Sequence, residues 1–91
     1  MQSQINLESM PFYSRHLLQQ IQLRNIALVQ IEEVLQNPDH VIMEDGLTVF
    51  QKLFYENNKR CLLRIFVNEK KQPPVVVTAY KTSKINKYLL P

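Results

Sequence analysis

The spacing of apolar residues changes at Asn37-Pro38-Asp39, and this change limits what the chain can fold into. Before this point apolar residues recur every three or four positions, as on the buried face of a helix. After it they alternate with polar residues, as in half-buried strands. Proline cannot continue the hydrogen-bond ladder of a helix, so the two regimes are separated there. Helices followed by a run of strands predict an α+β fold with an antiparallel sheet.

Local signals place the expected elements. Ser14 is a good N-cap for a helix over residues 15–24, and Asn25 suits its end because asparagine tolerates the left-handed conformation. The remaining expected elements are a helix at 28–36, strands at 40–44, 47–56, 60–68 and 75–80, turns at Asp45-Gly46 and Asn57-Asn58, and a helical turn near 85–89. We expect residues 1–11 to form a flexible arm and residues 12–91 to form a single domain.

Composition excludes several classes of protein. Gly46 is the one glycine among 91 residues, which excludes a glycine-rich phosphate loop and therefore P-loop and Rossmann nucleotide enzymes. Cys61 is the one cysteine, which excludes an internal disulfide and fits a reducing cytoplasm. No apolar run is long enough to cross a bilayer, and the first residues lack the pattern of a signal peptide. We therefore expect a cytoplasmic protein.

Charge is divided unevenly along the chain. Residues 1–45 carry two basic and six acidic side chains, whereas residues 46–91 carry nine basic and two acidic ones, so the halves have net charges of −4 and +7. A basic half on a small domain favours a polyanionic partner, nucleic acid first. The alternative interpretation is a lysine-rich surface that keeps the protein soluble.

The first expected helix carries a polar stripe. His16, Gln20 and Arg24 are spaced by four residues and so form one slanting row. Histidine exchanges a proton near neutral pH, which makes His16 a candidate for acid–base chemistry. The alternative is an ordinary surface histidine. Metal binding is not expected, because His16 and His40 are isolated and no metal-ligand spacing is present. No cofactor is expected.

The third expected strand places an arginine in an apolar setting. Alternation puts Arg64 on one face with Leu62 and Phe66, opposite a core face. That core face carries Cys61, Leu63, Ile65 and Val67, and we interpret Cys61 as buried packing. A guanidinium in mid-sheet needs water, a carboxylate or an anion such as phosphate. The structural alternative is an ion pair with Glu32 or Glu33 of the second helix.

The end of the chain is rich in hydroxyl groups, lysines and tyrosines. Alternation places Thr78 and Tyr80 on one face of the last strand, with Val77 and Ala79 on the other. Lysines follow at 81, 84 and 87, and Tyr88 could stack on a base. Hydroxyl and ammonium groups at the end of a strand suit contacts with phosphodiesters. They also suit an ordinary polar turn.

Several segments together resemble a known family. They are Ser14-Arg15-His16, Arg24-Asn25-Ile26, Asn37-Pro38-Asp39 and the run from Val77 to Lys84. The resemblance covers about residues 12–90 and is to a prokaryotic domain-of-unknown-function family whose members open with S-x-H-x-x-x-R-x-x-x-R-G-I and close with strands like V-T-x-Y-K-T-S. That family looks like a relative of RelE/ParE-type toxins within the barnase, EndoU and colicin-nuclease superfamily. Gln20 and Asn25 depart from the pattern, which usually has arginine and glycine at these positions.

The resemblance implies two N-terminal helices packed on a four-stranded, mainly antiparallel curved sheet, RelE-like in form. It also implies the toxin of a toxin–antitoxin system, a metal-independent endoribonuclease with a cognate antitoxin and RNA as partners. We expect catalysis by His16, Arg64 and Lys81. The residues expected to bind RNA are Arg24, Lys52, Thr78, Tyr80, Lys84 and Tyr88. The assembly would be a homodimer or a toxin–antitoxin hetero-oligomer.

Two further hypotheses remain open from the sequence. The first is a non-catalytic module of the same fold that binds protein or nucleic acid, which the missing cation at Gln20 favours. The second is a toxin of ParE type whose target is a protein, which would cause DNA damage without RNA cleavage.

Overall fold

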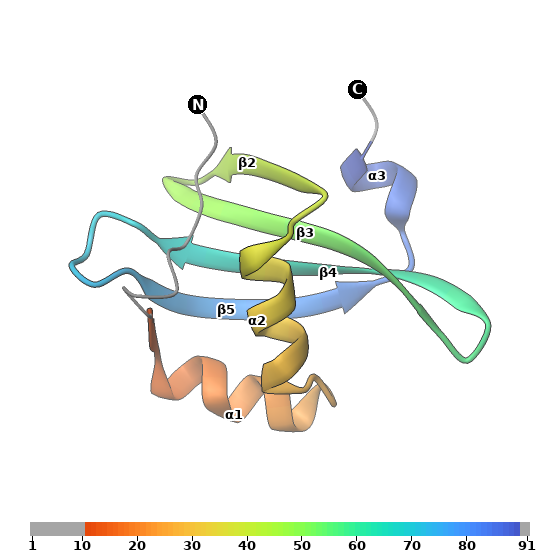
Figure 1. Ribbon diagram of the computed structural model, residues 1–91, viewed down its shortest axis with the longest axis horizontal. Helices are drawn as coiled ribbons and strands as arrows, with labels where there is room; N and C mark the ends of the chain where they lie inside the picture. Colours follow the sequence, from red (N-terminus) through yellow and green to blue (C-terminus); the bar gives the residue numbers. More distant parts are fainter. Residues whose placement is uncertain (1–10, 90–91) are drawn as a thin grey trace.

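The computed structural model describes residues 11–89, which form one five-stranded sheet with three helices (Figure 1). The elements are β1 (Phe12–Tyr13), α1 (Arg15–Leu23), α2 (Leu28–Gln36), β2 (His40–Glu44), β3 (Leu47–Glu56), β4 (Lys59–Asn68), β5 (Val75–Thr82) and α3 (Ile85–Leu89). The strand order is β1-β5-β4-β3-β2, and every pair is antiparallel except β1 with β5. The expected α+β class is confirmed. The expected arm lies, except for the buried Pro11, outside the described residues.

The sheet has five strands where the sequence pattern predicts four. The additional strand is β1, in which Phe12 and Tyr13 pair in parallel with Val75 and Val76. Two residues are too few to show an alternating pattern, so periodicity cannot reveal such a strand. The structure also has a third helix at the expected helical turn, and β5 continues two residues beyond the predicted end.

Side-chain hydrogen bonds and turn residues set the helix ends as the sequence indicates. Ser14 caps α1, because its hydroxyl oxygen accepts a hydrogen bond from the Leu17 amide at 3.0 Å. Asn25 follows α1 with a positive φ of 57°, the left-handed conformation expected there. At the start of α2, the side-chain oxygen of Gln30 accepts from the Ala27 amide at 3.1 Å. Hydrogen bonds thus fix the short connection between the two helices.

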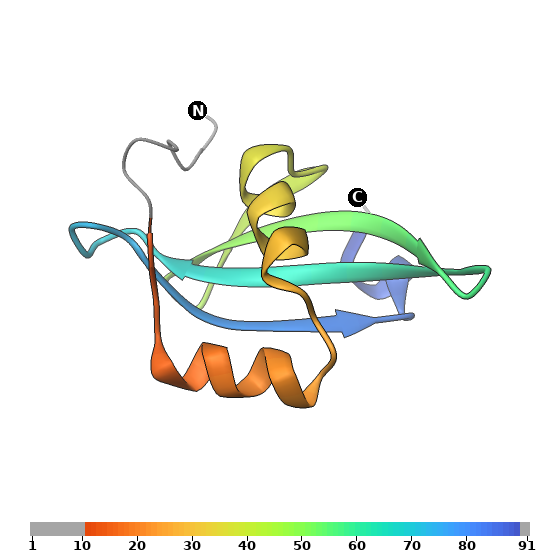
Figure 2. The ribbon, with the colours of Figure 1, turned by 60° about the horizontal axis from the view of Figure 1, so that its bottom comes forward.

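The core lies between the sheet and the two N-terminal helices. Figures 1 and 2 show α2 crossing one face of the sheet while α1 runs along the β5 side. The buried side chains that form the core are Leu17, Ile21, Ile26, Ile31, Val34, Leu35, Phe50, Leu63, Ile65, Val67, Val76 and Ala79. We call this side of the sheet the helix face. The two N-terminal helices do not cover the opposite face, which carries the candidate site.

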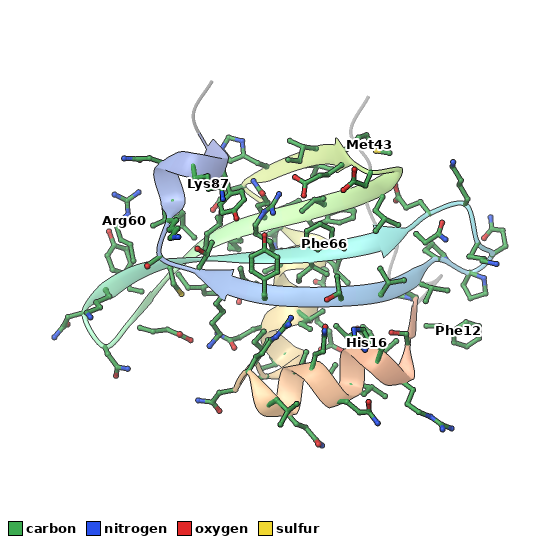
Figure 3. All side chains as sticks on the ribbon, turned by 180° about the vertical axis from the view of Figure 1, so that it is seen from behind. Phe12, His16, Met43, Arg60, Phe66 and Lys87 are labelled. Carbon is green, nitrogen blue, oxygen red and sulfur yellow. The ribbon has the colours of Figure 1, made fainter. Side chains whose placement is uncertain are left out.

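We call the opposite side of the sheet the back face. The predicted alternation in β4 is confirmed, because Leu63, Ile65 and Val67 enter the core while Arg64 does not. In β5 the core side chains are Val76 and Ala79, because a register shift between Phe66 and Val67 of β4 interrupts the simple alternation expected along β5. Figure 3 shows the back face with α3 lying over one end. Within residues 11–89, no helix is long and apolar enough to span a membrane.

Candidate functional site

The centre of the back face is an arginine whose guanidinium has a partner at every nitrogen. Arg64 Nε donates to Gln51 Oε1 at 2.6 Å, Nη1 to the Tyr80 hydroxyl at 2.5 Å and Nη2 to Glu44 Oε2 at 2.8 Å. The side chain of Arg64 is 1% exposed, whereas that of Glu44 is 40% exposed. The ion pair is therefore dry at one end and open to water at the other. We call these four residues the Arg64 cluster.

Three aromatic rings surround the guanidinium. Its carbon lies 4.1 Å from the ring centre of Tyr88, 5.2 Å from that of Phe66 and 5.6 Å from that of Tyr80. Tyr88 comes from α3, so this short helix covers the arginine. A cation over an aromatic face is attracted by the quadrupole of the ring, and guanidinium suits this contact because it is weakly hydrated. The rings thus help to hold a charge in an apolar setting.

Two hairpin turns bring the cluster together. The turn at Asp45-Gly46 pairs Glu44 with Leu47, and the turn at Asn57-Asn58 sets a register in which Gln51 faces Arg64. On the other side of β4, Arg64 is paired with Tyr80 of β5. Alternation along each strand then places these side chains on the same face. The cluster therefore follows from turn geometry and strand period.

The surroundings of the cluster shift two pKa values. Burial acts to lower the pKa of Arg64, but its hydrogen bonds to Glu44 and Tyr80 act in the opposite direction, and the net result is a raised pKa. Burial, and then a hydrogen bond with Tyr88, raise the pKa of Tyr80 above its ordinary value, while Arg64 opposes the rise. At neutral pH the site therefore holds a guanidinium cation and a neutral phenol.

The partner of Arg64 differs from the one considered in the sequence analysis. Glu32 and Glu33 lie on α2, which covers the helix face, so neither is the carboxylate that pairs with Arg64. Sequence reasoning missed Glu44 and Gln51. Counting outward from the two hairpin turns, with the alternation of β3 and β4, was the signal that could have found them. Among the described residues, the side-chain nitrogen of Gln51 is buried without a hydrogen-bond partner.

The polar stripe of α1 runs along the β5 side of the sheet. Gln20 Oε1 accepts from the Thr78 hydroxyl at 2.5 Å, and Arg24 Nη1 donates to the Ala79 carbonyl at 2.8 Å. Figure 3 shows His16 on α1 next to β5, and its side chain is exposed. Within residues 11–89, no hydrogen bond or ion pair joins His16 to Arg64. The stripe borders the back face through Thr78 without entering the Arg64 cluster.

Two of the expected site lysines lie on the helix face, away from the Arg64 cluster. Lys81 Nζ donates to both carboxylate oxygens of Glu56 at 3.0 Å. Lys52 donates to the Asn37 carbonyl at 2.9 Å and lies 3.6 Å from Asp39. Their register partner in β4 is Leu63, a core residue, so the structure does not join either lysine with Arg64 in one site. The physical reason is alternation, because residues 63 and 64 point to opposite faces.

The other expected site residues occupy separate positions. Thr78 and Tyr80 lie on the back face, where Tyr80 contacts both Arg64 and Phe66. Tyr88 packs on Arg64, and Lys84 is exposed just before α3. Cys61 is half-buried, and burial together with the neighbouring Glu56 raises the pKa of its thiol. Its thiol donates to Glu56 Oε1 at 3.7 Å, and its partial exposure makes Cys61 less enclosed than the buried packing predicted from the sequence.

A pocket opens at the end of β5, apart from the Arg64 cluster. Its volume is about 330 Å³. It is lined by Glu56, Asn57, Lys59, Arg60, Cys61, Lys81, Thr82 and Ser83. Within residues 11–89, no group of three or more histidine, cysteine, aspartate or glutamate side chains is arranged to hold a metal ion.

Comparison with known proteins gives one family match. No curated protein and no solved structure matches the chain. The family model described as "Domain of unknown function (DUF4258)" matches residues 13–81. The matched segment includes Glu44, Arg64 and Tyr80 and ends before Tyr88. Because the match covers more than half of the sequence, the chain belongs to the DUF4258 family.

Proposed function

We propose that the protein is a metal-independent endoribonuclease of toxin type, similar to RelE/ParE-type toxins, with the Arg64 cluster as its active site. The observation that carries the proposal is the asymmetric ion pair, in which Arg64 is buried and Glu44 is open to water. A buried, correctly oriented cation next to an accessible carboxylate suits a reaction that builds negative charge on a phosphate.

The exposed side of Glu44 provides a route for substrate to reach the arginine. A phosphate oxygen arriving from solvent would take the place of the carboxylate at Arg64 Nη2, since both are anionic acceptors for a guanidinium. The displaced Glu44 would remain beside the bound phosphate. The unpartnered side-chain nitrogen of Gln51, next to Arg64, supplies a further donor at the inner end of the site.

The proposed reaction is an internal transesterification. Glu44 accepts the proton of the ribose 2′-hydroxyl, and the 2′-oxygen forms a bond to the adjacent phosphorus. Arg64 stabilises the additional negative charge on the phosphate. The bond from phosphorus to the 5′-oxygen breaks, and Tyr80 donates its phenolic proton to that oxygen. The products are a 2′,3′-cyclic phosphate and a free 5′-hydroxyl, and Glu44 returns its proton to the Tyr80 phenolate through solvent.

Tyr80 suits the role of proton donor because it keeps its proton at neutral pH. Burial raises its pKa, and its hydroxyl lies 2.5 Å from Arg64 Nη1, so donor and cation act on the same phosphate. In this arrangement His16 and Gln20 border the site and would contact the RNA strand at the β5 side. This replaces the shared site of His16, Arg64 and Lys81 expected from the sequence, because Lys81 lies on the opposite face.

The proposal includes an antitoxin partner and a cytoplasmic location. A ribonuclease of this kind in the cytoplasm needs a cognate antitoxin, which would bind the toxin in a hetero-oligomer or a homodimer-based complex. Inducible production of the chain should then arrest growth and yield RNA fragments that end in cyclic phosphate. Arg64→Lys should abolish both effects, because lysine keeps the charge and lacks the planar fork. Unimpaired growth with intact RNA, from protein that is produced and folded, would refute the proposal.

A second candidate is favoured by a specific observation. Arg64, Lys52 and Lys81 each lie within 4 Å of a carboxylate, so three of the cations expected in the site are internally neutralised. This favours a module that binds a protein or nucleic acid without cleaving it. Binding of RNA that weakens steeply with salt, without cleavage, would identify this module. DNA damage without RNA cleavage would instead identify a toxin of ParE type.

A further inference from the structure

The pocket at the end of β5 has no role in the reaction proposed above, and cationic side chains predominate in its lining. It contains three cationic side chains and two hydroxyl groups, against one carboxylate. We propose that this pocket binds a phosphate group of RNA, as a second phosphate site separate from Arg64. The identity of the ligand as RNA rests on the proposed function, whereas affinity of the pocket for phosphate does not.

The one carboxylate of the pocket is already neutralised. Lys81 Nζ holds both oxygens of Glu56 at 3.0 Å, and the side-chain nitrogen of Gln30 donates to one of them at 3.2 Å. These hydrogen bonds lower the pKa of Glu56, so it remains ionised and paired. Lys59 and Arg60 are exposed and are left as the net positive charge of the pocket. A surplus of cations in a concave site favours an anion.

The backbone at the pocket also supplies a donor. The pairing of β4 with β5 begins at Leu62 and Thr82. Arg60 precedes Leu62 in β4, so no residue of β5 pairs with it. Glu56 pairs with Lys59 next to the two-residue turn, and alternation then directs the N–H of Arg60 away from β3. That amide therefore opens toward the space after β5. Amide N–H groups beside arginine and hydroxyl side chains are a common phosphate environment.

The pocket spans the end of the sheet: Cys61 and Lys81 belong to the helix face, whereas Arg60 and Thr82 belong to the back face, so an RNA strand bound at Arg64 would reach the pocket through Arg60. Arg60 and Arg64 are four residues apart on the same face of β4, a separation of about 13 Å along a strand. The pocket volume of about 330 Å³ accommodates a phosphate with part of its sugar. Thr82, which lines the pocket, lies in β5 two residues after Tyr80, which belongs to the Arg64 cluster.

Cys61 provides a direct test, because it lines the pocket and is the one cysteine of the chain. The rate of its alkylation by iodoacetamide is measured at about pH 9, since its pKa is raised. The rate is compared without ligand and with inorganic phosphate, adenosine 5′-monophosphate or a short single-stranded RNA. The same series is run on the double variant Lys59→Gln/Arg60→Gln. The matched control is Lys70→Gln/Lys71→Gln, which removes two charges from the loop at the far end of β5.

The proposal predicts several-fold slower alkylation with RNA in the natural protein and in the control, and no protection in the pocket variant. The slope of log K against log salt for RNA binding should also be shallower by about 0.7 in the pocket variant, the value for one single-strand phosphate contact. Protection by the mononucleotide as well would show that the pocket holds a phosphate without the polymer. Equal rates with and without RNA, or equal protection in the pocket variant, would overturn the inference. Protection by RNA that is never cleaved would refute the nuclease and leave the pocket in place.

Discussion

Arg64 on β4 and Glu44 on β2 form an ion pair of 2.8 Å that reaches across β3 on the back face of the sheet. The arginine is almost completely buried and the glutamate is substantially exposed. Removing one partner of a buried ion pair leaves the other charge uncompensated, which destabilises the folded protein. Here the exposed partner is the one that solvent can reach. The stability of the cluster therefore depends on Glu44 as well as on Arg64.

Replacing Glu44 tests the structural part of this relationship. Glu44→Gln keeps an oxygen acceptor but removes the negative charge, so Arg64 loses part of its compensation. We expect the free energy of unfolding to fall by about 1–2 kcal/mol, since water can reach this end of the pair. Urea denaturation measures the change. Glu33→Gln, an exposed glutamate on α2, should leave stability within about 0.5 kcal/mol of the natural protein. Equal stability of the two variants would show that the ion pair contributes nothing.

Tyr88 of α3 covers the guanidinium of Arg64, and we expect its aromatic ring, rather than its hydroxyl group, to stabilise the contact. Tyr88→Ala removes a ring that lies 4.1 Å from the Arg64 carbon, so we expect a loss of about 1–2 kcal/mol in the free energy of unfolding. Tyr88→Phe keeps the ring and should lose less than half of that. The exposed Tyr55 offers a matched truncation, and Tyr55→Ala should have a smaller effect than Tyr88→Ala. If Tyr55→Ala and Tyr88→Ala were equivalent in thermal unfolding, α3 would not be docked on the arginine.

The connection between α1 and α2 depends on one backbone conformation. Asn25 has a φ of 57°, which glycine adopts freely and alanine does not. We expect Asn25→Ala to lower the free energy of unfolding by about 1 kcal/mol and Asn25→Gly to leave it nearly unchanged. Guanidinium denaturation of both variants checks the order. If Asn25→Ala were more stable than Asn25→Gly, the left-handed conformation of residue 25 would be contradicted.

The Glu56–Lys81 pair makes stability depend on pH in the acid range. Hydrogen bonds from Lys81 and then from Gln30 lower the pKa of Glu56 below its ordinary 4.5. A carboxyl with a lowered folded-state pKa stabilises the protein above its unfolded-state value, and this stability is lost as the pH falls through the folded-state pKa. Glu56→Gln should therefore flatten the loss of stability below pH 4.5. Urea midpoints measured across the acid range check this. If the stability of Glu56→Gln fell with pH as steeply as that of Glu33→Gln, the sensitivity to acid would come from other groups.

The sequence predicted the elements better than it predicted the contacts between them. Asp45-Gly46 and Asn57-Asn58 form the expected turns because few residues accept their positive φ, and the periods of α2 and β4 set which faces are buried. β1 was missed because its pairing with β5 depends on tertiary position rather than on its own pattern.

In the candidate site, too, local features could be predicted from the sequence and contacts between elements could not. Arg64 was singled out because a cation in mid-strand needs compensation, and this is a local argument. Its partner was misjudged because the choice between α2 and β2 depends on which face α2 covers. Lys81 was grouped with Arg64 on chemical grounds, although strand alternation places it on the opposite face.

Cleavage of a defined RNA by the purified protein tests the central claim most directly. A single-stranded RNA labelled at its 5′ end is incubated in the presence of a chelator with the natural protein, Glu44→Gln or Glu33→Gln, below the temperature at which any of them unfolds. We predict cleavage to products ending in 2′,3′-cyclic phosphate, at equal rates for the natural protein and Glu33→Gln. The rate with Glu44→Gln should be about 10²–10⁴-fold lower, the usual effect of removing a general base. Intact RNA with the folded natural protein, or an unchanged rate with Glu44→Gln, would contradict the assignment of the Arg64 cluster as a nuclease site.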